Sequence, residues 1–514
     1  METQTNPNEP PGRTVRVAWL WTAVFLGATA LYVGTAQRGV SWQDSGMFQW
    51  RVLTGDVTGK LGLALAHPLY IAAGRALATV SADHLPALLN AFSGVGMAVA
   101  LANLAAVVAI LTGRRWIGLL IAAVLAVAHT PWWLATIAEV YTWSIAGLTA
   151  ELWLLVLLIR RPNWQALAAL ALVSGLGWSL HNFALLPLPV YLAAMIVLLA
   201  RRKLPGWSLA VAAAAYVVGA GPYLAMIVPL AARAGVVEAV RSALVGNYGR
   251  QVTNLAAVSM HWKANAALTA MNFVSALLPL AVVGWIRFRK RLGGALAAAL
   301  AAVTLIEIVF YVRYPVPDQF TFLLPSLVLI AVAAGVGLAV LSDAWRAAAV
   351  AACLASIVIQ PAFYALAPDL ARRQMGSRVR ERELPFRDEL RYWMTPWKHN
   401  ENSAERFARA ALAQAAPNGV ILPDSTSEHP LLLVQRLEGL SPRVAVQYEG
   451  QPLPPYSRNP GRFRRILGDR RLFAVTSQPG DLPRALSSDA TIERAPGNML
   501  YSIDLGGSGP STRP

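Results

Sequence analysis

The segment from residue 85 to residue 115 reads LPALLNAFSGVGMAVALANLAAVVAILTGRR, an apolar run without a charged residue that ends in a pair of arginines. A helix over residues 85–112 is long enough to cross the hydrocarbon core of a bilayer, which needs about 20 residues. A helix also satisfies its own backbone hydrogen-bonding groups, as lipid requires. This stretch therefore predicts a transmembrane helix that ends at Arg114 and Arg115.

The same pattern recurs along the chain and decides the fold class. The 514 residues are 56% hydrophobic and 14% charged, whereas a soluble protein carries about 25% charged residues. We predict an α-helical polytopic membrane protein with about 11 spans. Besides 85–112, the predicted spans are 17–36, 116–134, 139–159, 164–181, 183–200, 207–231, 264–286, 293–313, 320–341 and 347–367.

Basic residues set the predicted topology. They cluster near the N-terminus, at Arg13 and Arg16, and then in every second loop, ending at Arg346. By the positive-inside rule the N-terminus is cytoplasmic and the region after residue 367 is extracytoplasmic. The net charge of +17 therefore indicates topology determinants and contacts to anionic lipid, not nucleic-acid binding. Arginine far exceeds lysine and alanine is abundant, so we expect a bacterial cytoplasmic (inner) membrane protein.

Polar and ionisable residues gather on the predicted outer face, which we therefore expect to be the working surface. Its first loop, residues 37–84, contains SWQDSGMFQWRVLTG (41–55) and HPLYIAAGRALATV (67–80). Both stretches are too short to span and are expected to form interfacial helices. The polar set on this face comprises Asp44, Asp56, His67, Asp83, His84, Glu139, His181, Arg250, His261, Arg313 and Asp318.

The chain after residue 367 has a different pattern, in which short apolar runs alternate with helical stretches. We expect strands at 419–423, 444–448, 472–477 and 499–505, and helices at 403–416 and 428–438. Alternating β and α elements predict a small α/β domain. The predicted organisation is thus a transmembrane domain over 1–367 and an extracytoplasmic α/β domain over 368–514.

Asp44 is the first candidate functional residue, and it has two interpretations. An aspartate at a helix start can be an N-cap, whose side chain accepts otherwise unpaired backbone N–H groups. A carboxylate at the bilayer surface with a raised pKa can instead take the proton of an attacking hydroxyl, as a general base does. The two interpretations are compatible.

The other outer candidates also have both a structural and a functional interpretation. The His-Pro pair at 67–68 and the His-Asn pair at 181–182 can be turns, whereas Glu139 borders a span, where acids are functional candidates. Arg313 and Asp318 can form a surface ion pair, or Arg313 can clamp a phosphate with its planar fork. The candidate substrate- and donor-binding residues are His67, Glu139, His181, Asn182, Arg313 and Asp318.

Tryptophan, histidine and cysteine point to no further chemistry. We expect the tryptophans at 42, 50, 132 and 133 to lie in the aromatic belt of the membrane interface. The seven histidines do not have metal-ligand spacing, and one cysteine, Cys353, allows no intrachain disulfide. The sequence therefore indicates no metal site and no cofactor, and leaves a requirement for a divalent metal open.

Five short motifs follow one another along the chain: QDSGMF, AHPLY, AEVYTW, GLGWSLHNFALLPLP and YPVPDQFTFLLPSLVL. In this order they resemble a bacterial membrane family akin to the protein O-mannosyltransferase represented by transmembrane protein 260, within the GT-C superfamily. The resemblance extends from the first span to about residue 340. It implies a GT-C fold, a sugar donor linked to polyprenyl phosphate, and Asp44 as catalytic base. The chain departs from the family pattern at Met47, where relatives have glutamate, and in the shortened AHPLY.

These expectations define the predicted function. The chain is expected to be an inverting glycosyltransferase that moves a sugar from a polyprenyl-phosphate donor to a hydroxyl of a protein, lipid or glycan acceptor on the outer face. Cations such as Arg313, or else His67, would stabilise the charge of the leaving phosphate. Two alternatives remain: a polytopic transporter or lipid flippase, and a non-catalytic paralogue.

Overall fold

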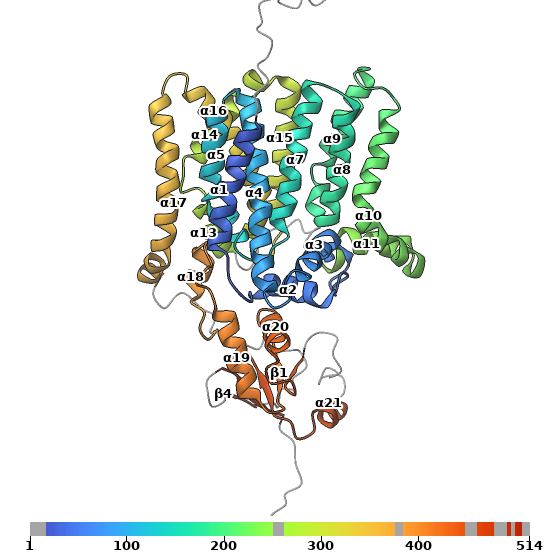
Figure 1. Cartoon of the computed structure of the whole chain (residues 1–514), viewed down its shortest axis with the longest axis vertical. Helices are drawn as coiled ribbons and strands as arrows, with labels where there is room; N and C mark the ends of the chain where they lie inside the picture. Colours follow the sequence, from blue (N-terminus) through green and yellow to red (C-terminus); the bar gives the residue numbers. More distant parts are fainter. Residues whose placement is uncertain are drawn as a thin grey trace, which may run out of the picture.

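The computed structural model describes residues 17–249, 262–375, 384–447, 460–476, 491–494 and 499–505. Within these ranges the protein is an upright bundle of helices with a small α/β domain at one end (Figure 1). The predicted fold class, a helical polytopic membrane protein with an α/β tail, is confirmed.

Among the described residues, eight helices are long and apolar enough to cross a membrane. Three shorter helices, α5 (Arg115–Ala126), α8 (Trp164–Leu180) and α14 (Leu277–Leu292), stand in the same bundle (Figure 1), and together these helices account for the predicted spans. The eight are α1 (Ala18–Thr35), α4 (Leu85–Thr112), α7 (Tyr141–Arg160), η2 (Asn182–Leu185) with α9 (Leu188–Ala200), α10 (Ser208–Ala234), α15 (Gly294–Arg313), η4 (Gln319–Leu323) with α16 (Leu324–Leu341), and α17 (Arg346–Met375).

Two predicted spans are broken in the structure. The span expected at 116–134 ends at Ala126 and a separate short helix, α6 (His129–Leu134), follows. Pro131 gives the reason, because its ring is tolerated in the first turn of α6 but would clash with a carbonyl inside a continuous helix. The span expected at 264–286 is likewise divided into α13 (Trp262–Met271) and α14.

Small residues bring the bundle helices close together. A Cβ atom on Gly284 of α14 would collide with the carbonyl of Ala333 of α16, and one on Gly337 of α16 would collide with the carbonyl of Leu280. Close approach at small residues supports helix association in lipid, where no hydrophobic effect drives it. At the centre, α4 and α16 are the most deeply buried spans.

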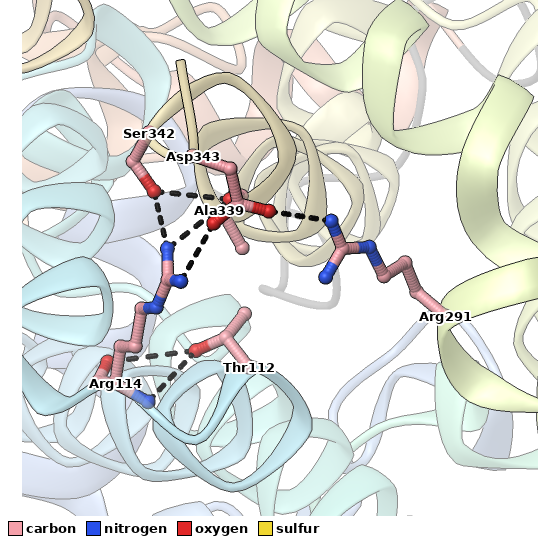
Figure 2. A network of polar contacts seen from close by, with 6 residues as sticks. All are labelled: Thr112, Arg114, Arg291, Ala339, Ser342 and Asp343. Carbon is pink, nitrogen blue, oxygen red and sulfur yellow. Dashed lines mark hydrogen bonds and ion pairs between the residues drawn. The ribbon is translucent and has the colours of Figure 1, made fainter. Parts of the chain in front are cut away.

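One end of the bundle carries an ion-pair network (Figure 2). The Asp343 carboxylate forms two ion pairs. Its Oδ1 accepts a hydrogen bond from Arg114 Nη2 at 2.7 Å, and its Oδ2 accepts one from Arg291 Nη2 at 2.7 Å. Arg160 lies at the same end, where its Nη1 donates to the carbonyl of Ile110 at 3.0 Å. The loops that contain these arginines therefore share one end, as predicted for the cytoplasmic side.

The other end carries the short helices of the first predicted outer loop (Figure 1). They are α2 (Gln43–Thr54) and α3 (Pro68–Ala78), with η1 (Leu63–Leu65) between them. The prediction that both stretches form short helices is confirmed. Nearby lie α11 (Val236–Leu244) and η3 (Gly246–Tyr248), whereas the predicted outer residues Arg250 and His261 lie outside the described residues.

The tail begins where α17 ends, past the expected boundary at residue 367, and its helices are α18 (Glu389–Met394), α19 (Ser403–Ala415), α20 (Glu428–Glu438) and α21 (Pro460–Leu467). Its five-stranded sheet has the order β2-β1-β3-β5-β4, with β1 parallel to both neighbours and β5 antiparallel to both of its own. The strands are β1 (Val420–Leu422), β2 (Ala445–Val446), β3 (Leu472–Ala474), β4 (Thr491–Arg494) and β5 (Tyr501–Asp504).

Four of these strands and two of the helices fall where the sequence predicts them. The strand β4 was not predicted, because its sequence, TIER, is polar and mostly exposed at the sheet edge. Buried strands, by contrast, appear as apolar runs, as β1 and β3 do.

The tail also changes the predicted role of the tryptophans. Trp42, Trp132 and Trp133 have exposed fractions of 0%, 6% and 4%, so the prediction that they lie in an interfacial belt is wrong. The segment before α19 covers α6: Trp133 stacks on Trp393 at 5.4 Å between ring centroids, and Trp132 meets Trp397 at the same distance. Their rings pack against the tail, which the sequence pattern does not indicate.

Candidate functional site

Three carboxyl groups from separate segments meet at the tail-facing end of the bundle. Asp44 lies in the first turn of α2, Glu139 between α6 and α7, and Asp318 between α15 and η4. The charge of Asp44 acts on both of the others and raises their pKa values, so the three lie within electrostatic reach of one another. The sequence identified each residue singly, and the structure brings them together.

Asp44 is not the N-cap of α2. The N-cap is Trp42, and Asp44 is an acid in the first turn, where the helix dipole favours a negative charge. Its side chain is exposed, yet the surrounding protein desolvates it and raises the pKa of the carboxyl. The Asp44 carboxyl is therefore accessible, while the surrounding protein disfavours its charge.

The backbone beside two candidate residues is strained. Gln43, which precedes Asp44, has a φ of 54°, and His67 has a φ of 52°. A left-handed conformation costs a residue with a side chain about 1–2 kcal/mol. Such strain persists only where surrounding contacts enforce it, and it is concentrated at functional sites.

Glu139 is buried next to α2. The Ser45 hydroxyl donates to its Oε1 at 2.7 Å, and its backbone N–H donates to Ser93 Oγ at 2.8 Å. Burial first, and then the charge of Asp44, raise the pKa of Glu139 well above its usual value. Like charges in a dry site oppose one another's ionisation, so an ionised Asp44 favours the protonated form of Glu139.

Asp318 occupies a turn that α13 holds in place. Asn265 of α13 accepts the N–H of Phe320 at 2.9 Å and donates to the carbonyl of Pro317 at 3.0 Å. Burial and the neighbouring Asp44 raise the pKa of Asp318 to about 7. A carboxylate in a tight ion pair would have a lowered pKa. The raised pKa of Asp318 therefore reflects its burial and the nearby Asp44 carboxylate.

His67 and His181 stack with ring centroids 5.0 Å apart and an interplanar angle of 8°. His67 Nδ1 lies 2.7 Å from the carbonyl of Leu180 and must donate, because a carbonyl only accepts. His181 Nδ1 accepts the N–H of Phe183 at 3.1 Å. The two Nε2 atoms therefore differ: His67 presents an acceptor and His181 presents a donor.

Both histidines are neutral. Burial and the charge of Arg51 lower the pKa of His67 to about 3, and burial followed by His67 lowers the pKa of His181 well below its usual value. A neutral imidazole adds no positive charge beside a phosphate, and a role for His67 in donor binding stays a prediction. The sequence could not show this, because burial by distant segments removes the charge.

The remaining candidates have different environments. Asn182 uses its amide to donate to the carbonyls of Ala243 and Leu244, at 2.9 and 3.2 Å, and so ties the η2 turn to α11. Arg313 is half-buried as the last residue of α15, five positions before Asp318 in the chain.

Two tyrosines were missed by the sequence analysis. Burial first, and then the charges of Asp44 and Asp318, raise the pKa of the Tyr248 phenol. Burial, Tyr248 and Asp318 raise the pKa of the Tyr314 phenol, so both phenols lie near the carboxyl groups. Tyr314 could have been found, because it begins the YPVPDQ motif. Tyr248 has no local signal, since η3 approaches the site only through the tertiary fold.

The three carboxyl groups do not form a metal site by their arrangement. Among the described residues, no group of three His, Cys, Asp or Glu side chains is placed to hold a metal ion. What the arrangement offers is an accessible carboxyl that can act as a base, a buried carboxyl beside it whose pKa is raised, and two neutral imidazoles with opposite hydrogen-bonding roles. Such a site suits proton transfer from a neutral hydroxyl.

The sequence matches no family model and no curated protein. The structure is similar to the crystal structure of ArnT from Cupriavidus metallidurans bound to undecaprenyl phosphate, with a TM-score of 0.55 and 14% identity over 96% of this chain and 100% of that chain. An oligosaccharyltransferase from Archaeoglobus fulgidus, tethered to an acceptor peptide containing the NVT sequon, matches with a TM-score of 0.42 and 13% identity over 94% and 74% of the two chains. The closer family resemblance stays a prediction, and the likeness to ArnT shows that the two chains share a fold.

Proposed function

We propose that this protein is a membrane glycosyltransferase that moves a sugar from a polyprenyl-phosphate donor to an acceptor hydroxyl at the outer face of a bacterial cytoplasmic membrane. The observation that carries the proposal is Asp44, an accessible carboxyl group in the first turn of α2 that meets the buried Glu139 and Asp318 at one end of a membrane bundle. The GT-C fold, and the undecaprenyl phosphate bound to ArnT, support a lipid-phosphate donor.

Asp44 is the general base of the proposed reaction. The acceptor oxygen attacks the anomeric carbon from the face opposite the phosphate, and its proton passes to the Asp44 carboxylate. The bond between the anomeric carbon and the phosphate oxygen breaks, and its electron pair leaves with polyprenyl phosphate. One displacement inverts the configuration of the sugar.

The leaving phosphate needs a positive charge, and Arg313 is the proposed source. Its guanidinium presents a planar fork that matches phosphate oxygens. The neutral pair His67 and His181 can accept and donate hydrogen bonds to uncharged groups, which suits sugar hydroxyls better than a phosphate. In this assignment Arg313 contacts the phosphate, whereas His67 and His181 contact the sugar.

The proposed function can be tested on purified full-length protein in lipid nanodiscs. Undecaprenyl-phosphate mannose, glucose and galactose, each radiolabelled in the sugar, are supplied as donors, and release of water-soluble sugar is followed with and without a peptide or glycan acceptor. We expect one donor to be consumed, with undecaprenyl phosphate as the lipid product.

A transporter or flippase would give a different result. In proteoliposomes it would move the intact lipid-linked sugar between leaflets without forming free undecaprenyl phosphate. A non-catalytic paralogue would neither move nor cleave any donor. Either outcome would exclude the proposed transferase.

A further inference from the structure

The tail domain holds the segment that leads into α2. Both α19 and the turn before α20 contact residues 40–43, which immediately precede Asp44. Three hydrogen bonds make this connection: Val40 N–H to Glu405 Oε1 at 3.0 Å, Trp42 Nε1 to Ser403 Oγ at 2.8 Å, and Gln43 N–H to the Thr426 carbonyl at 3.2 Å. The last of these bonds holds the strained residue, whose φ is 54°.

One buried aspartate organises the turn that supplies the Thr426 carbonyl. Asp424 Oδ1 accepts the N–H groups of Thr426 and Ser427 at 3.1 and 2.9 Å, and the Ser427 hydroxyl at 2.8 Å. Asp424, Thr426 and Ser427 are 7%, 2% and 0% exposed. The direction of the Thr426 carbonyl therefore depends on the Asp424 side chain.

The first turns of α2 and α20 are also in van der Waals contact. A Cβ atom on Gly46 would lie 3.3 Å from His429 Cβ and 3.4 Å from Pro430 Cδ, both at the start of α20. Asp44 lies between this contact and the Gln43 hydrogen bond. The tail thus constrains the backbone on both sides of the proposed base.

We propose that Asp424 is a positioning residue for Asp44, so that the tail domain takes part in catalysis by holding the base in its reactive orientation. The proposal rests on the proposed function, in which Asp44 takes the acceptor proton. A displacement of about 1 Å at a reacting group can cost about 10²-fold in rate. Without the Asp424 turn, Gln43 loses the contact that keeps it left-handed, and Asp44 leaves the position from which it reaches the acceptor.

The test compares Asp424→Ala with Asp424→Asn in the full chain, using the undecaprenyl-phosphate hexose that the wild type consumes. Asparagine keeps the Oδ1 acceptor, so Asp424→Asn should turn over at about the wild-type rate. Alanine should lower kcat about tenfold or more with the donor KM within about twofold. Glu493→Ala, at an exposed position of the edge strand β4, serves as control and should leave kcat unchanged.

A double-mutant cycle with Gln43→Gly separates positioning from a general structural role. Glycine adopts a positive φ without the steric cost, so its backbone no longer depends on the tail. We expect Asp424→Ala to lower kcat less than about threefold when Gln43→Gly is present. An unchanged tenfold loss in that background would overturn the proposal. If Asp424→Ala does not fold, Asp424→Ser, which keeps a shorter acceptor, takes its place.

Hydrogen–deuterium exchange of residues 41–48 gives a readout that needs no activity. Asp424→Ala should speed exchange in this segment, and Asp424→Asn should not. Equal exchange in all three proteins would refute the positioning role even if the wild type is an active transferase. If the wild type consumes no donor and Asp424→Ala still speeds exchange in residues 41–48, the proposed function is refuted. The contact by which the tail holds this segment is then still supported.

Discussion

Carboxylates at the two ends of the helical bundle have opposite surroundings. At the end shown in Figure 2, Asp343 lies between Arg114 and Arg291, and hydrogen bonds from both guanidinium groups lower the pKa of its carboxyl. At the tail-facing end, Asp44, Glu139 and Asp318 lie near one another, and desolvation by the surrounding protein raises all three pKa values. The first arrangement connects the ends of helices, whereas the second places like charges together at an energetic cost, as active sites do.

The two ends should face opposite sides of the membrane. With Cys353 replaced, an impermeant thiol reagent added to intact cells should label Lys60→Cys fully and Arg289→Cys hardly at all, because the basic end is expected to be cytoplasmic. Lys60 is exposed beside α2, and Arg289 lies in the last turn of α14. Labelling at 289 without permeabilisation would invert the assignment.

The strongest effect on activity is expected at Asp44. Asp44→Asn keeps the shape of the side chain but removes the base, so turnover should fall about 10²-fold or more. The matched control at the other end is Asp343→Asn, which should leave turnover unchanged. The measurement is sugar transfer at equal amounts of folded protein. Full activity in Asp44→Asn would move the search for the base to Glu139.

A smaller effect is expected at Arg313. Charged hydrogen bonds contribute about 1.5–3 kcal/mol, so Arg313→Ala should lower kcat/KM for the donor about 10- to 100-fold. Arg313→Lys retains the charge and loses the fork, and should therefore be less impaired. The prediction is checked by measuring kcat/KM over a range of donor concentrations for both variants. If both retained wild-type kcat/KM, Arg313 would not contact the phosphate.

Asp318 should change how stability depends on pH. Its pKa is raised to about 7 in the folded protein from a model-peptide value of 3.8, so its stabilising contribution is complete below pH 3.8 and is lost as pH rises through 7. Thermal unfolding in detergent at pH 5 and pH 8 should show a smaller loss at high pH for Asp318→Asn than for the wild type. An identical pH dependence would contradict the raised pKa.

The smallest effect is expected from the ion pairs at the opposite end. Asp343→Ala removes two bridges whose side chains are 38–46% exposed, and exposed bridges contribute little and are screened by salt. We expect a slight fall in Tm in low salt that disappears in 1 M NaCl. A fall that persists in high salt would show a structural role beyond the charges.

The sequence by itself determines the features that depend on neighbouring residues and on the solvent. Lipid forces long apolar segments such as 85–112 into helices, and short apolar runs such as 420–422 and 472–474 indicate strands wherever they are buried. Proline already explains, in retrospect, the break before Pro131. Asp44, Glu139 and Asp318 were each recognisable, because an acid beside an apolar segment is costly.

Only the tertiary structure decides how these residues act. The pKa values of Asp44, Glu139 and Asp318 rise because separate segments desolvate them, and the charge of His67 disappears because the surrounding protein and then Arg51 oppose it. The left-handed Gln43 is held by a carbonyl of the distant tail. Desolvation and Coulomb interactions act through space and not along the chain, so the convergence that makes this site was decided by the fold.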